Sequence, residues 1–335
     1  MPDTARSDRA SGPTPLILTD DVRDSRAWRR AELSPQDWLV TLPARGVDEL
    51  DAVVQHVRRN PLPTLLLSPA EFALTACAEV MRSVRAKLCS GVGLAVVDRV
   101  PVERYEPEEN RLLCWLLTQL LQRPVAQAWN GAILYDVRDT GKTLEYGVRR
   151  SVTNLDLTFH TDGPWLDLPP HLVGLYCVNP AQEGGVSRFV SLLTVHNELR
   201  RRHPDLLPRL YQPYPWDRQA EHAPDDGRTG SQPIFQWDGR SFVGRFNERL
   251  IEAGAELDGA PLDAPGRAAL DAMREVVDSP DLWVEFTIER GQIQYLNNRE
   301  FAHSRTDFRD ASEPHLKRHL IRVWTREEGR RPFHA

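Results

Sequence analysis

The sequence predicts a mainly β protein with flanking helices, built on a double-stranded β-helix (jelly roll) core. After residue 130, the 335-residue chain changes from long helical patterns to short β-like runs. Turn sequences with glycine, such as Glu183-Gly184-Gly185 and Arg290-Gly291, separate these runs. Many short strands joined by such turns are typical of a sandwich or jelly roll. The predicted strands are Leu172–Val178, Val186–Ser191, Pro233–Trp237, Trp283–Ile288, Gln292–Leu296 and His319–Trp324.

Helical patterns dominate the first 130 residues. Ser68, Pro69 and Glu71 have the spacing of a capping box with proline at the first helical position, which predicts a helix over Ser68–Leu88. The other predicted elements are a buried strand at Gly91–Asp98 and helices at Pro107–Gln122, Leu192–Tyr211 and Ala264–Val277.

The domain organisation follows from polar segments. The chain begins with a polar stretch that lacks the apolar region of a secretory signal, so we expect a flexible tail over residues 1–25. No linker-like boundary follows, and we expect residues 26–335 to form one domain, helix-rich to about residue 130 and jelly roll after it. Residues 213–233 hold four prolines and two glycines, which predicts a mobile loop and a candidate lid.

Composition excludes several functional classes. A formal net charge of −6 argues against nucleic acid as the main partner. No apolar run is long enough to span a membrane. The four cysteines form no CxxC pair, which favours buried reduced thiols over disulfides or a zinc cluster. We therefore expect a cytoplasmic protein that binds neither nucleic acid nor membrane, and homo-oligomerisation is left open.

A histidine followed two residues later by a carboxylate occurs three times, at His160-Thr161-Asp162, His196-Asn197-Glu198 and His203-Pro204-Asp205. On a strand, residues two apart share a face, whereas on a helix they project to nearly opposite sides. Only the first pair follows a strand-like run, Leu155–Phe159, while the second lies in a predicted helix and the third at a helix break. The first pair is therefore the candidate metal site.

His303 is the candidate third ligand. It follows the predicted strand Gln292–Leu296, and strands distant in sequence pack side by side in a jelly roll. Two histidines and one carboxylate leave coordination positions open, as oxygen chemistry at ferrous iron requires. The same donors also suit zinc. Taken singly, His160 fits a hydrogen-bonded core histidine and His303 a surface loop equally well.

Five ordered segments resemble the taurine dioxygenase and clavaminate synthase-like superfamily of Fe(II)- and 2-oxoglutarate-dependent oxygenases. They cover roughly residues 130–326. The segments are Phe159-His160-Thr161-Asp162, Glu183-Gly184-Gly185-Val186-Ser187, Arg290-Gly291-Gln292 leading into Asn297-Asn298-Arg299, His303-Ser304-Arg305-Thr306, and Arg318-His319-Leu320-Ile321-Arg322-Val323-Trp324.

The resemblance implies that His160, Asp162 and His303 bind iron. It further implies that Arg318 and Ser187 bind the distal carboxylate of 2-oxoglutarate; a guanidinium suits a carboxylate in bidentate geometry. The Gly184-Gly185 sequence before Ser187 also reads as an ordinary tight turn.

Two tentative substrate residues remain. Arg322 shares a strand face with Arg318, and it either contacts an anionic group of the substrate or pairs with an internal carboxylate. Trp165 lies three residues after Asp162, and it either lines the substrate pocket or packs in the core.

The resemblance implies a dioxygenase that uses Fe(II), 2-oxoglutarate and O2 and releases succinate and CO2. We expect hydroxylation of an unactivated carbon in a small polar or anionic metabolite or natural-product intermediate. Desaturation or cyclisation would use the same ligand set. A zinc-dependent hydrolase and a catalytically silent binding protein are the alternatives from other classes.

Overall fold

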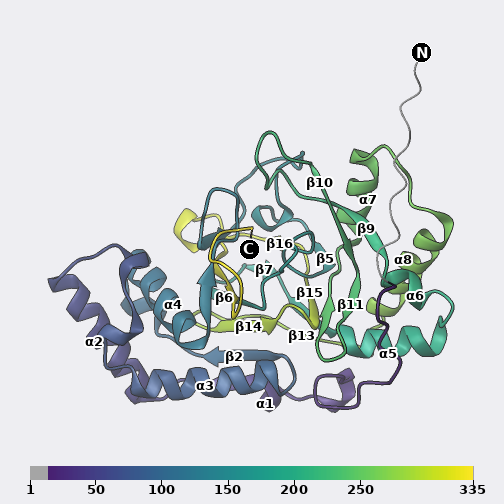
Figure 1. Ribbon diagram of the computed structural model, residues 1–335. Helices are drawn as coiled ribbons and strands as arrows, with labels where there is room; N and C mark the ends of the chain where they lie inside the picture. The colour runs from purple at the N-terminus through teal and green to yellow at the C-terminus, as the bar shows by residue number, and fades with distance from the viewer. Residues whose placement is uncertain (1–13, 335) are drawn as a thin grey trace.

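The computed structural model describes residues 14–334 and contains two main sheets (Figure 1). The seven-stranded sheet has the order β1 (Leu39–Thr41), β2 (Leu94–Asp98), β14 (Ile293–Asn297), β6 (Leu172–Asn179), β17 (His319–Arg326), β3 (Arg123–Val125), and β4 (Leu134–Val137) also pairs with β17. The four-stranded sheet has the order β13 (Trp283–Phe286), β8 (Ser187–Ser191), β15 (Phe301–Arg305), β5 (Leu157–His160). No helix among residues 14–334 combines the length and the apolar character of a membrane span.

Smaller elements complete the fold. The two-stranded pairs are β9 (Pro213–Asp217) with β10 (Thr229–Pro233), β11 (Phe235–Trp237) with β12 (Phe242–Gly244), and β7 (Glu183–Gly184) with β16 (Phe308–Arg309). The helices are α1 (Pro35–Trp38), α2 (Ala44–Arg59), α3 (Thr75–Cys89), α4 (Pro107–Leu121), α5 (Leu192–Arg202), α6 (Leu207–Leu210), α7 (Glu248–Leu257) and α8 (Ala264–Val277).

The seven-stranded sheet has one face against helices and one face toward the site. Ile293, Tyr176 and Ile321 lie opposite one another across β14, β6 and β17, and all three belong to the core formed with α3 and α4. Figure 1 shows α2, α3 and α4 on this side, whereas α5 to α8 gather around the other end of the molecule. Because side chains alternate along a strand, the residues next to these three face the interior.

Several predicted elements are confirmed and one helix start is wrong. The helices at Pro107–Gln122 and Ala264–Val277 are α4 and α8, and the helical region Leu192–Tyr211 divides into α5 and α6. The capping box at Ser68 is present, but it begins only one 3-10 turn, and the chain is extended again at Phe72. Helix α3 starts at Thr75.

A side chain from the neighbouring helix α2 caps the N-terminus of α3. The carboxylate of Glu49, on α2, accepts hydrogen bonds from the backbone N–H groups of Ala76 and Cys77 at 2.9 and 3.0 Å. These are N–H groups of a first helical turn, which have no partner within the helix. The sequence signal at Ser68 therefore marks a turn before the helix, and a long-range contact fixes the helix itself.

The predicted N-terminal tail is too long. Residues 1–13 lie outside the described residues, but the segment after them is held against α5 and α6. The side-chain amide of Asn197 exchanges hydrogen bonds with the backbone of Val22 at 3.0 and 2.8 Å, and Leu18 N–H donates to the Tyr211 hydroxyl at 3.3 Å. Ile17, Leu18 and Val22 pack on the core. Residues 17–25 are therefore part of the fold.

The predicted loop over residues 213–233 contains a hairpin. Strands β9 and β10 pair antiparallel along their whole length, from Pro213 opposite Pro233 to Asp217 opposite Thr229. Residues 218–228 connect them. The loop prediction is wrong for the two strands. The connection contains no helix or strand, and its mobility and its role as a lid stay predictions.

The cysteines are free thiols, as predicted. Cys77, Cys114 and Cys177 are buried, and this burial raises the pKa of each thiol to about 12. Thiols of this kind are inert at neutral pH, so the cysteines contribute packing.

Candidate active site

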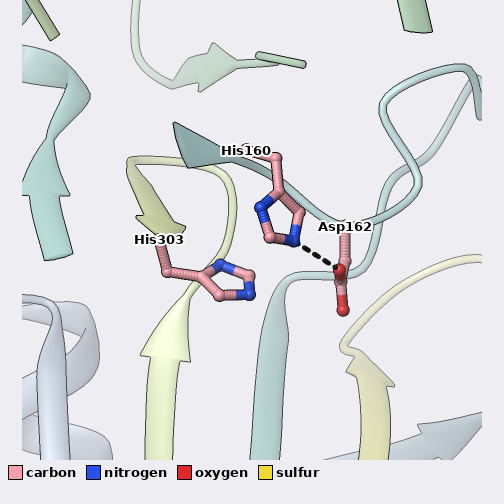
Figure 2. A group of neighbouring side chains, drawn as sticks. All are labelled: His160, Asp162 and His303. Atoms are coloured by element: carbon pink, nitrogen blue, oxygen red, sulfur yellow. Dashed lines mark ion pairs between the residues drawn. The ribbon is translucent and has the colours of Figure 1, made fainter. Parts of the chain in front are cut away.

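Three side chains converge between β5, β15 and the segment after β5 (Figure 2). His160 ends β5 and lies directly opposite His303 in β15. Their ring centroids are 4.3 Å apart, and His160 Nε2 lies 3.7 Å from Asp162 Oδ1. One donor atom from each residue lies within 4.8 Å of the other two, and all three side chains are buried. Among the described residues this is the one group of three or more such side chains with metal-ligand spacing.

The competing histidine–carboxylate pairs do not converge on a common point. His196 accepts or donates a 2.8 Å hydrogen bond with the Tyr211 hydroxyl, and Glu198 forms ion pairs with Arg29 and Arg201. His203 caps the end of α5. His196 and Glu198 lie in the helix α5, as predicted, whereas His160 is the last residue of β5 and Asp162 lies two residues beyond the end of that strand.

The protonation states of the three residues suit a divalent metal. His160 Nδ1 lies 2.9 Å from the Thr158 carbonyl oxygen, which can only accept, so Nδ1 carries the hydrogen and Nε2 is free. Burial lowers the pKa of His160, and burial together with His160 lowers the pKa of His303 to about 3. His303 Nδ1 is buried without a hydrogen-bond partner. Two neutral imidazoles beside a carboxylate are ordinary ligands for iron or zinc.

Asp162 is held from two sides. Its backbone N–H donates to Asn298 Oδ1 at 2.7 Å, and Asn298 Nδ2 returns a 3.0 Å bond to the Asp162 carbonyl. Its carboxylate accepts from Trp324 Nε1 at 2.8 Å and pairs with Arg322 Nη1 at 3.1 Å. Burial would raise the pKa of Asp162, but the charge of Arg322 and the neighbouring histidines lower it to about 2. The carboxylate is therefore ionised and fixed in orientation.

A cavity beside these residues, here called the Ser187 cavity, brings together the side chains expected to bind 2-oxoglutarate. Arg318 is 4% exposed, and its Nη1 has no hydrogen-bond partner. Burial lowers the pKa of Arg318 to about 10, so it still carries its charge at neutral pH. The lining contains no acidic side chain: Val137, Ser151, Leu157, His160, Leu175, Ser187, Gln294, His303, Ser304, Arg305, Arg318 and Arg322. Arg322 pairs with Asp162, but Arg318 and Arg305 form no ion pair with any described residue, and buried cations of this kind fit an anionic ligand such as 2-oxoglutarate.

A second cavity, here called the Trp165 cavity, shares His160 and Arg322 with the Ser187 cavity. Trp165 is 6% exposed, lines this cavity and also belongs to the core, so both interpretations of this residue hold together. Arg149, Arg150, Arg249 and Arg322 line it, and Asp162 is its one acidic residue.

Arg322 has partners that the sequence did not reveal. Besides Asp162, its Nε donates to Gln127 Oε1 at 2.7 Å, while the Gln127 carbonyl accepts from both terminal nitrogens of Arg149 at 3.2 and 3.1 Å. Both guanidinium groups lie near the Tyr135 ring, at 5.5 Å for Arg149 and 5.0 Å for Arg322. Arg322 thus pairs with an internal carboxylate, and its Nη2 has no partner. The one sequence signal was the pair Arg149-Arg150, which reads as an exposed charge run.

Comparison with known proteins assigns the class. The chain is a non-haem iron, 2-oxoglutarate-dependent dioxygenase. The model of the "Taurine catabolism dioxygenase TauD, TfdA family" matches residues 60–324, and the chain belongs to this family.

Individual relatives cover most of the chain at low identity. FR-33289 synthase of Streptomyces rubellomurinus is 24% identical over 323 residues, 95% of this chain and 94% of that protein. Taurine hydroxylase-like protein SAT17 of Stachybotrys chartarum is 25% identical over 318 residues, 91% of this chain and 80% of that protein. Asparagine oxygenase in complex with Fe(II), 3-hydroxyasparagine and succinate has a TM-score of 0.65 at 16% identity, covering 87% of this chain and 94% of that one. Its likeness shows that the sheets and helices form the same fold.

Proposed function

We propose that His160, Asp162 and His303 hold Fe(II), and that Arg318 and Ser187 bind the distal carboxylate of 2-oxoglutarate. The convergence of three buried donors beside a cavity whose Arg318 lacks a counter-charge carries this proposal. When bound, iron and 2-oxoglutarate would together activate O2: one oxygen atom would enter succinate as 2-oxoglutarate loses CO2, and the other would oxidise an unactivated carbon of the substrate. The residues of the chain fix Asp162, keep both histidines neutral and exclude acidic groups from the cofactor cavity.

The substrate is proposed to be a small polar or anionic molecule that is hydroxylated. Four arginines line the Trp165 cavity, and Asp162 is its single carboxylate. Arg322 Nη2 and Arg149 Nε are buried without partners, so an anionic group of the substrate would satisfy them. Trp165 and Trp324 supply apolar walls for the carbon to be oxidised. Desaturation or cyclisation stays open because the same residues would serve them.

We also propose that the two sheets form a jelly roll within one oxygenase domain, which takes in residues 17–25 as well as the predicted range from residue 26 onward, and that residues 218–228 act as the lid. Gln219, in this connection, lines the Trp165 cavity. Glu221 forms a 2.5 Å ion pair with the buried Arg149, and His222 forms a 3.1 Å hydrogen bond with the Tyr146 hydroxyl. These contacts support a lid that closes over the Trp165 cavity.

A substrate screen tests the proposal. The protein is incubated with Fe(II), 2-oxoglutarate and O2 over amino acids, sulfonates and betaines, and succinate release is measured together with an added oxygen atom in the product. We expect turnover of anionic compounds and loss of turnover when the anion is capped as an amide. Equal turnover of the capped compounds would contradict an anionic substrate, and succinate release that persists in His160→Ala would contradict the metal site.

A further inference from the structure

Gln294 is a buried amide without partners. It is the second residue of β14, is 1% exposed, and neither its Nε2 nor its Oε1 forms a hydrogen bond. An unpaired buried amide loses its bonds to water and gains nothing in return. Buried side-chain polar groups are nearly always paired, so each exception requires an explanation.

The other buried glutamines show that this fold pairs such groups. Gln122 bonds His171 through Nε2 and Thr325 through Oε1, at 2.9 and 2.5 Å. Gln127 and Gln292 also form hydrogen bonds through both ends of their amides. Gln294 is therefore the exception among the buried glutamines of residues 14–334.

Strand register directs Gln294 into the Ser187 cavity. Gln294 lies opposite Leu175, which in turn lies opposite Arg322, so the three share one face of the seven-stranded sheet. Its neighbours Ile293 and Tyr295 belong to the helix-covered core on the other face. Gln294 lines the same cavity as Ser187, Arg318 and His303.

We propose that Gln294 is a further binding residue for 2-oxoglutarate, with Nε2 donating to a carboxylate oxygen of this cofactor. This proposal rests on the proposed function of the site. A carboxylate can only accept, and the primary amide offers two N–H donors. A neutral donor suits a position where Arg318, Arg305 and Arg322 already supply positive charge.

Binding measurements on matched variants test the inference. The probe is 2-oxoglutarate, titrated calorimetrically into anaerobic Fe(II)-loaded protein, for the wild type, Gln294→Leu and the control Gln122→Leu. We expect Gln294→Leu to weaken binding about tenfold, the effect of one hydrogen bond to a charged group. Gln122→Leu should bind as the wild type does because Gln122 lies outside both cavities. Gln294→Glu should weaken binding further, since it places a carboxylate against the carboxylates of the cofactor.

Stability supplies the second measurement. In metal-free protein, Gln122→Leu breaks formed hydrogen bonds and should lower the melting temperature more than Gln294→Leu, which removes an amide that has none. Unchanged 2-oxoglutarate affinity in Gln294→Leu would overturn the inference, as would an equal loss of melting temperature in the two variants. Failure of the wild type to bind 2-oxoglutarate would instead contradict the proposed function itself.

Discussion

Asp162 is the residue on which the site depends most. It serves as a proposed iron ligand, as the counter-charge of the 6% exposed Arg322 and as the acceptor of the Trp324 indole N–H. Its position is set by Asn298, which lies 136 residues later in the chain. Asp162 thus connects the metal site and the Trp165 cavity through its side chain, and it contacts the segment after β14 through its backbone.

Replacing Asp162 should destabilise the protein even without metal. In Asp162→Ala, Arg322 loses its ion-pair partner inside the fold, and an uncompensated buried charge costs about 3 kcal/mol or more. The matched control is Asp156→Ala, which removes an exposed partner of Arg150 and should cost about 1 kcal/mol or less. Urea unfolding of the metal-free proteins measures both. Equal losses of unfolding free energy in the two variants would show that Asp162 is not needed to compensate the charge of Arg322.

At this scale the sequence predicted the residues whose types are distinctive and missed those that depend on register. The structure brings His160, Asp162 and His303 together and places Ser187 and Arg318 in the adjoining cavity, while their roles in binding stay proposals. Gln127, Arg149 and Gln294 carry no local signal because their roles depend on strands and loops that are distant in sequence. A glutamine on a buried strand interrupts the apolar pattern but indicates no function by itself, because the residues that face it come from strands distant in sequence.

At the scale of elements, β15 positions the site because it carries His303 and pairs with β5, which carries His160. It lies between β8 and β5, and its residue Phe301 packs over Gly93, just before β2. Gly93 has φ of +72°, and a Cβ there would lie 1.8 Å from the Phe301 ring. The close approach of this glycine to Phe301 therefore fixes the start of the strand that carries His303.

Gly93→Ala should destabilise the protein far more than a glycine replacement in open space. Gly131 has φ of +82°, and a Cβ added there would have no atom within 4 Å, so Gly131→Ala should cost only the left-handed backbone strain of about 1–2 kcal/mol. Gly93→Ala adds the clash with Phe301, and we expect a total of about 3 kcal/mol or more. Thermal unfolding compares the two; similar losses would show that Phe301 moves aside freely.

An ion pair between the buried Arg149 and the partly buried Glu221 joins the connection between β9 and β10 to the wall of the Trp165 cavity. Gln219 and Ala220 adopt φ of 51° and 58°, a strained backbone for non-glycine residues, next to the Arg149–Glu221 pair. Strained segments of this kind are often functional, which is consistent with the proposed lid.

Glu221→Gln should therefore loosen residues 218–228 without changing the metal site. Loss of the ion pair with Arg149 should speed amide hydrogen exchange in this segment about tenfold, equivalent to ~1.4 kcal/mol. Affinity for Fe(II) and 2-oxoglutarate should stay the same. Asp226→Asn is the control, because it removes the exposed end of a pair with Arg218 in the same segment. Exchange at the wild-type rate in Glu221→Gln would show that the Arg149–Glu221 ion pair does not hold residues 218–228 in place.

At the scale of the whole molecule, the seven-stranded sheet combines strands from the region before residue 130 with strands from the region after it. The sequence predicts helices and one buried strand, Gly91–Asp98, before residue 130; the structure shows that strand as β2 and adds β1 and β3, which were not predicted, and all three belong to the large sheet. β2 lies between β1 and β14, although β1 and β2 belong to the first 100 residues and β14 begins at Ile293. Strands of three residues, such as β1 and β3, have little periodicity to detect, and the pairing of all three strands is decided by tertiary contacts.

The proposed function requires that the three-residue metal site and Arg318 bind Fe(II) and 2-oxoglutarate together. Anaerobic titration of the Fe(II)-loaded protein with 2-oxoglutarate, followed by visible absorption, measures this joint binding. We expect a saturable new band for the wild type, no band for His160→Ala or His303→Ala, and a much higher half-saturating concentration for Arg318→Leu. The exposed Arg309→Leu should behave as the wild type. A wild-type protein without the band, or a band that survives in His160→Ala, would show that the iron and the cofactor are not bound in this way.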